Sequence, residues 1–178
     1  MLILVNSIVP FVFAFLVLYG ALSDLSRFRI PNAVSYGLVL LFGLHTFLVW
    51  LATPFMPSLE FRLPPFTFNL LVAAIVFAIS VVFWKLRLIG GGDVKYLTAT
   101  SLWMGPQLAA IFVLLLTVLA LALVLALKLL SNWSFLVHGT RLPLFVKQLF
   151  SKLEVNQLPY GFPIGLAALA MIPWLFPG

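Results

Sequence analysis

The run LAAIFVLLLTVLALALVLALKLL occupies residues 108–130 and contains a single charged residue, Lys128. A helix needs about 20 mostly apolar residues to cross a bilayer, so this run predicts a transmembrane helix. The composition agrees, because 64% of the residues are hydrophobic and 8% are charged, against roughly 25% charged in an average soluble domain. We therefore expect an all-α, polytopic membrane protein whose residues 1–178 form a single integral-membrane domain.

Five further apolar segments bring the expected number of transmembrane helices to about six. One of them, 94–104, is interrupted by Gly105-Pro106 and would reach only about 16 Å as a helix, roughly half of the hydrocarbon thickness. It either continues through Pro106 or packs as a half-span against its neighbours. The first segment lacks a basic stretch before it, which favours a retained helix over a cleaved signal. The other four segments cover residues 4–23, 32–52, 67–84 and 161–176.

Residues 142–154 have a different pattern from the rest of the chain. Apolar residues recur there at helical spacing, while lysines and other polar residues fill the opposite face. This pattern predicts an amphipathic helix lying in the membrane interface. A basic connector without a specific role is the alternative.

The basic residues indicate the orientation of the chain. With six spans and the N-terminus outside, all ten Lys and Arg residues except Arg62 fall on the inner side or next to it. This bias follows the positive-inside rule. The net charge of +6 therefore indicates orientation and contact with anionic lipid, and not nucleic-acid binding.

Asp24 and Asp93 are the two aspartates of the chain, and each lies where an apolar segment meets a polar loop. Ionisable residues at a membrane boundary are costly and are presumed functional. Two expected spans separate them, so both belong to the cytoplasmic side. The chain has no cysteine and no His-Glu-x-x-His, and no metal site or cofactor is expected. The pair is therefore the candidate catalytic site.

Paired carboxylates suit the hydrolysis of a peptide bond. One carboxylate can activate a water molecule while its protonated partner polarises the carbonyl, because two neighbouring carboxylates do not both ionise easily. The run Gly90-Gly91-Gly92-Asp93-Val94-Lys95 supports this interpretation. Its glycines remove side-chain bulk and permit positive φ angles, which would let an extended peptide approach Asp93.

Two motifs resemble those of the type IV prepilin peptidase family. The first is Asp24-Leu25-Ser26-Arg27-Phe28-Arg29-Ile30-Pro31-Asn32, and the second is the Gly-x-Gly-Asp run that ends in Lys95. Pro159-Tyr160-Gly161 resembles the segment that opens the last helix of the short members. The chain resembles the short members, which lack the cysteine-containing N-terminal domain of the longer members. The resemblance therefore does not extend to methylation of the new N-terminus of the product, an activity attributed to the longer members.

The resemblance implies a membrane aspartic endopeptidase that removes the short basic leader of prepilins or pilin-like proteins at the cytoplasmic face of the cytoplasmic membrane. Asp24 and Asp93 would be catalytic, and Gly90, Gly92 and Lys95 would contact the substrate. Presenilin-type proteases share Gly-x-Gly-Asp, but Leu22-Ser23-Asp24 and the absence of Pro-Ala-Leu argue against them. A small transporter or assembly factor that handles protons or cations with the two aspartates is the alternative from another class. A transport site belongs near the bilayer midplane, whereas both aspartates are expected at its edge.

Overall fold

The computed structural model describes residues 2–52, 66–136 and 159–176, and every regular element in these ranges is a helix. The expected all-α class is thus confirmed. The helices are α1 (Leu2–Arg27), α2 (Asn32–Ala52), α3 (Phe66–Lys85), α4 (Gly91–Leu136), α6 (Gly161–Ala170) and α7 (Ile172–Leu175).

Four of the described helices are long and apolar enough to cross a membrane, which makes the chain a multi-pass membrane protein. About six spans were expected, and the described residues contain four such helices. The expected spans 94–104 and 108–130 both fall within α4, and residues 161–176 form the short helices α6 and α7. The predicted interfacial helix at 142–154 lies outside the described residues.

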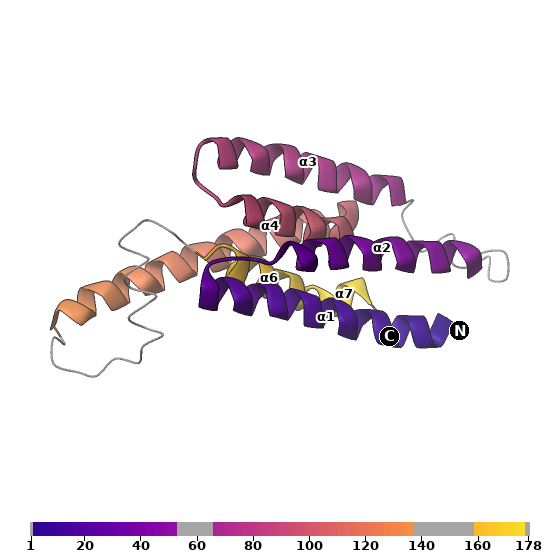
Figure 1. The fold of residues 1–178 in the computed structure, drawn as a ribbon, viewed down its shortest axis with the longest axis horizontal. Helices are drawn as coiled ribbons and strands as arrows, with labels where there is room; N and C mark the ends of the chain where they lie inside the picture. The colour runs from indigo at the N-terminus through magenta and orange to yellow at the C-terminus, as the bar shows by residue number, and fades with distance from the viewer. Residues whose placement is uncertain (1, 53–65, 137–158, 177–178) are drawn as a thin grey trace.

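The helices are arranged so that several of their ends meet on one side. In Figure 1, α1 and α2 run antiparallel, and α1 ends on the left, where α2 begins, α3 ends and α4 begins. Helix α4 packs against α2, α3 and α6, and α1 packs against α2 and α6. The loop after α1 and the loop before α4 therefore share one end of the bundle.

Helix α4 contains a break at Gly105, whose backbone angles (φ 57°, ψ −177°) are not helical. Its 46 residues would extend about 69 Å as one straight helix, more than twice the hydrocarbon thickness. The break favours the interpretation of residues 91–104 as a half-span with its own packing. The later half of α4 (salmon to orange) projects to the left beyond α1 and α2 in Figure 1.

Asn69 of α3 compensates for a backbone hydrogen bond that is lost at this break. In a continuous helix the N–H of residue 106 would donate to the carbonyl of Leu102, but Pro106 has no N–H. The Asn69 side-chain Nδ2 donates to the Leu102 carbonyl instead, at 3.0 Å. The amide thereby fixes α3 to the first half of α4, and α3 accordingly packs closely on α4.

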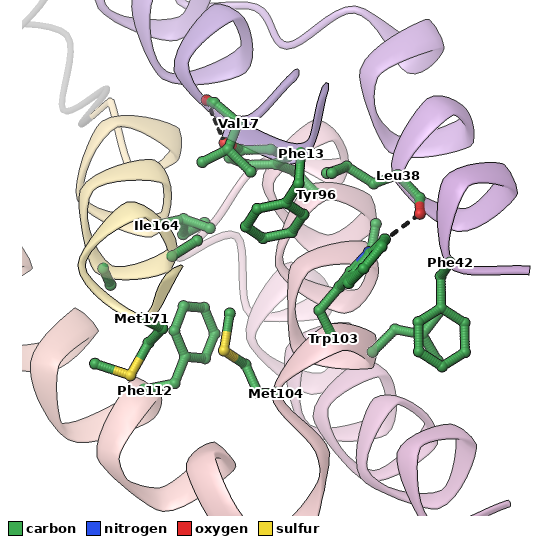
Figure 2. Packing of buried hydrophobic residues seen from close by; sticks show 14 of the residues in the cluster. Phe13, Val17, Leu38, Phe42, Tyr96, Trp103, Met104, Phe112, Ile164 and Met171 are labelled. Carbon is green, nitrogen blue, oxygen red and sulfur yellow. Dashed lines mark hydrogen bonds between the residues drawn. The ribbon is translucent and has the colours of Figure 1, made fainter. Parts of the chain in front are cut away.

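The buried core joins α1, α2, α4 and α6. Two side chains bond across it to backbone carbonyls: Trp103 Nε1 donates to Leu38 at 3.1 Å, and the Tyr96 hydroxyl donates to Val17 at 2.7 Å. Figure 2 shows both hydrogen bonds among the packed rings. Because lipid is as apolar as the core, close packing and such hydrogen bonds hold transmembrane helices together. The core thus fixes the helices whose ends carry the two aspartates.

Candidate active site

A hollow of about 350 Å³ lies between the loop that follows α1 and the loop that precedes α4. The structure brings Asp24 and Asp93 together in it, although they come from different helices. Its lining comprises Asp24, Phe28, Arg29, Ile30, Asn32, Gly90, Gly91, Gly92 and Asp93.

Asp24 lies in the last turn of α1 and is 5% exposed. Its Oδ2 accepts a hydrogen bond of 2.7 Å from the backbone N–H of Gly161, the first residue of α6. A carboxylate is favoured at a helix N-terminus, where backbone N–H groups are unpaired. A Cβ at residue 161 would lie 2.5 Å from Ile30 Cδ1 and 2.9 Å from Asp24 Oδ2. Glycine at this position therefore lets the backbone reach the carboxylate.

The chain leaves α1 through a left-handed residue, Phe28, with φ 54°. This conformation is a common way to end a helix, and the Phe28 N–H donates to the Asp24 carbonyl at 2.8 Å. The buried Ser23 then donates its hydroxyl to the Arg29 carbonyl at 3.0 Å. These two hydrogen bonds fold the loop back over the end of α1 and form one wall of the hollow.

Asp93 lies in the first turn of α4, and its Oδ2 accepts the backbone N–H of Gly90 at 3.0 Å. An acidic residue at this position of a helix commonly satisfies the N–H three residues earlier. A Cβ at residue 90 would lie 2.9 Å from Asp93 Oδ2. Gly90 therefore allows the carboxylate to fold over the helix start.

The expected positive φ angles in the glycine run are not observed. None of Gly90, Gly91 and Gly92 has φ in the left-handed region, because the last two already belong to α4. A Cβ at Gly92 or Gly91 would meet its nearest neighbour at 3.8 Å or 3.5 Å, which is ordinary contact. Within this run, an added Cβ would come too close to a neighbouring atom only at Gly90.

The N–H of Gly161 donates to Asp24 Oδ2. It is also close enough to Asp93 to interact electrostatically with that carboxyl group, as the two carboxyl groups do with each other. Helix α6 is thus the third element of the site. The sequence predicts that Pro159-Tyr160-Gly161 opens a helix, but no pattern in the sequence predicts that this segment contacts the aspartates.

Lys95 is exposed at the edge of this region. Its Nζ donates to Asn32 Oδ1 at 3.1 Å and so connects α4 to the start of α2. Asn32 lines the hollow, whereas Lys95 is not part of the lining. Among the described residues no three His, Cys, Asp or Glu side chains form a metal-binding group. His45 packs instead against the ring of Trp103, with the ring centroids 5.8 Å apart.

The model of the type IV leader peptidase family matches residues 11–126 of the chain, a range that contains both aspartates. The match confirms the resemblance carried by the two aspartate motifs. No curated protein and no solved structure matches the chain.

Proposed function

Since the chain belongs to the type IV leader peptidase family and is an aspartic-type prepilin leader peptidase, we propose that Asp24 and Asp93 form its catalytic dyad. The observation that carries this proposal is the hollow that both side chains line, in which Asp24 also accepts the N–H of Gly161. The reaction is the removal of the short basic leader from a prepilin or pilin-like protein.

The chemistry needs the two carboxyl groups in opposite protonation states. The ionised one takes a proton from a water molecule, whose oxygen adds to the scissile carbonyl carbon, while the protonated one donates to the carbonyl oxygen. The proton taken from water then passes to the leaving nitrogen as the carbon–nitrogen bond breaks. Backbone N–H groups bond Oδ2 of Asp24 and of Asp93, so each group is oriented and its other oxygen can hold the water.

The surroundings support access by an extended peptide from the cytoplasmic side. The hollow is bounded by two loops, and the glycines at 90–92 place no side chain in the path to Asp93. Lys95, with its bond to Asn32, holds the opposite walls together and is a candidate contact for the substrate backbone, along with Gly90 and Gly92. The basic residues Arg27, Arg29, Lys85, Arg87 and Lys95 at this end of the helices favour a cytoplasmic location.

The test is the cleavage of a co-expressed prepilin, followed by its mobility shift. Asp24→Asn and Asp93→Asn should each abolish cleavage, because an amide can neither activate water nor exchange the proton, while both variants still insert into the membrane. Glu60→Gln and Glu154→Gln, which remove the remaining acids of the chain, should cleave at a rate near that of the parent. Mature pilin produced by either aspartate variant would overturn the dyad assignment.

A further inference from the structure

Tyr96 is fully buried at the point where α1, α4 and α6 meet. Its hydroxyl donates to the Val17 carbonyl of α1 at 2.7 Å, as Figure 2 shows. That carbonyl lies inside a helix and needs no further donor. The hydrogen bond therefore serves to join α4 to α1.

Two glycines make room for the phenol ring. A Cβ at Gly20 of α1 would lie 3.0 Å from Tyr96 Cε2 and Cζ, and a Cβ at Gly165 of α6 would lie 3.1 Å from the Tyr96 hydroxyl. The same added Cβ at Gly165 would lie 2.6 Å from Ala21 Cβ. Small residues at such contacts let helix backbones approach closely. The ring is therefore confined by α1 on one side and by α6 on the other.

Gly20, Tyr96 and Gly165 each lie one helical turn from a group of the candidate active site. Asp24 follows Gly20 by four residues, Asp93 precedes Tyr96 by three, and Gly161 precedes Gly165 by four. One turn advances a helix by about 5.4 Å. The three groups of the site therefore lie side by side, one turn beyond the Tyr96 contact. If one helix shifted along its axis at Tyr96, the group that it carries would move by about the same distance as the helix.

We propose that Tyr96 is a positioning residue that sets the relative placement of the Asp24 and Asp93 carboxyl groups and of the Gly161 N–H. The proposal rests on the assignment of the two aspartates as the catalytic dyad. Tyr96 is fully buried, so it would act through the alignment of three helices. Its hydroxyl and the clearance at Gly20 and Gly165 together fix that alignment.

The first measurement is the kinetics of leader cleavage by purified protein. Tyr96→Phe keeps the ring and removes the hydrogen bond to Val17. It should lower kcat about tenfold while KM stays within about twofold, because the helices should shift by less than the ~1 Å that costs about 100-fold. Trp103→Phe is the matched control, because it removes the corresponding hydrogen bond to Leu38 farther along α4. It should leave kcat near the parent value. An unchanged kcat in Tyr96→Phe would overturn the proposal.

The second measurement reads the helix alignment without any catalysis. The chain has no cysteine, so spin labels can be placed at Ser26→Cys and Gly91→Cys, two exposed positions near the ends of α1 and α4 that carry the aspartates. The distance distribution between the labels should shift or broaden with Tyr96→Phe and stay unchanged with Trp103→Phe. An unchanged distribution in Tyr96→Phe would reduce Tyr96 to a general packing role and refute the proposal. Because both aspartates are retained and no cleavage is measured, this result stands even if the dyad assignment fails.

A pair of glycine variants covers the case in which Tyr96→Phe does not fold. Gly20→Ala presses a methyl group onto the Tyr96 ring, whereas Gly43→Ala places the same group where no atom lies within 4 Å. We expect Gly20→Ala to change the label distance and lower kcat, and Gly43→Ala to do neither. Equal behaviour of the two variants would contradict the proposal.

Discussion

Gly161→Ala is the substitution for which the structure gives the clearest expectation. The added Cβ would lie 2.9 Å from Asp24 Oδ2 and 3.0 Å from Asp24 Cβ, whereas carbon atoms in good contact are about 3.5–4.0 Å apart. Ile30 Cδ1, at 2.5 Å, ends a flexible side chain and can rotate away. The Asp24 Cβ is fixed by the backbone of α1, so α6 must shift, or the Asp24 carboxyl group must rotate, by about 0.5–1 Å to restore ordinary contact.

A displacement of this size should cost activity rather than stability. The hydrogen bond of 2.7 Å from the Gly161 N–H would lengthen, and a misplacement of about 1 Å lowers a rate about 100-fold, which is about 2.7 kcal/mol in activation free energy. Alanine in a helix is otherwise favoured over glycine by roughly 0.5–1 kcal/mol. Helix propensity therefore offsets part of the steric cost to stability, so the loss is expected in activity.

The assay is the rate of leader cleavage at equal amounts of membrane-inserted protein. Gly91→Ala is the matched control, since its Cβ would meet Trp84 Nε1 at an ordinary 3.5 Å and the position also lies in the first turn of a helix beside the site. It should cleave at a rate within about twofold of the parent. A normal rate for Gly161→Ala, or an equal loss in both variants, would refute the steric reasoning.

Four further changes have defined expectations. Gly90→Ala should slow cleavage more than Gly92→Ala, because the added Cβ lies 2.9 Å from Asp93 Oδ2 in the first and 3.8 Å from Ile30 in the second; equal rates would contradict this. Asn69→Leu should lower the thermal midpoint in detergent by an amount equivalent to about 1 kcal/mol, since the Leu102 carbonyl loses its donor. Lys95→Met should raise KM more than it lowers kcat, as expected for a residue that holds the substrate and not the water. The cleavage rate of the parent should be bell-shaped in pH, because one carboxyl group must be ionised and the other protonated, and a rate that only rises or only falls would count against the dyad.

The sequence predicted the helical class and the proximity of the two aspartate motifs, because both follow from the lengths and order of the apolar segments. Apolar runs of sufficient length specify membrane helices directly. The even number of crossings between the two motifs predicted that Asp24 and Asp93 share a side, and the structure has them lining one hollow. These inferences need no knowledge of side-chain packing.

The features that the sequence did not predict all depend on contacts between distant segments. The role of Gly161 follows from the packing of α6 against α1, and no local pattern reports the 2.7 Å bond to Asp24. In the glycine run an added Cβ would be too close to a neighbour only at Gly90, because Asp93 folds back on its own helix start, and the sequence does not predict this difference. The sequence left open whether the helix at 94–104 continues through Pro106, because this depends on contacts with another helix, here the hydrogen bond of Asn69 beside the Gly105 break.

The hydrogen bond between Gly161 and Asp24 can form only late in synthesis of the chain. Its partners are separated by 137 positions in the chain, and a ribosome that adds about 5–20 residues per second needs on the order of ten seconds to pass from one to the other. During that interval α1 is already made, but Asp24 lacks the N–H that orients it. The candidate site is therefore complete only after α6 has been synthesised, and a chain that has reached only α4 lacks the group that orients Asp24.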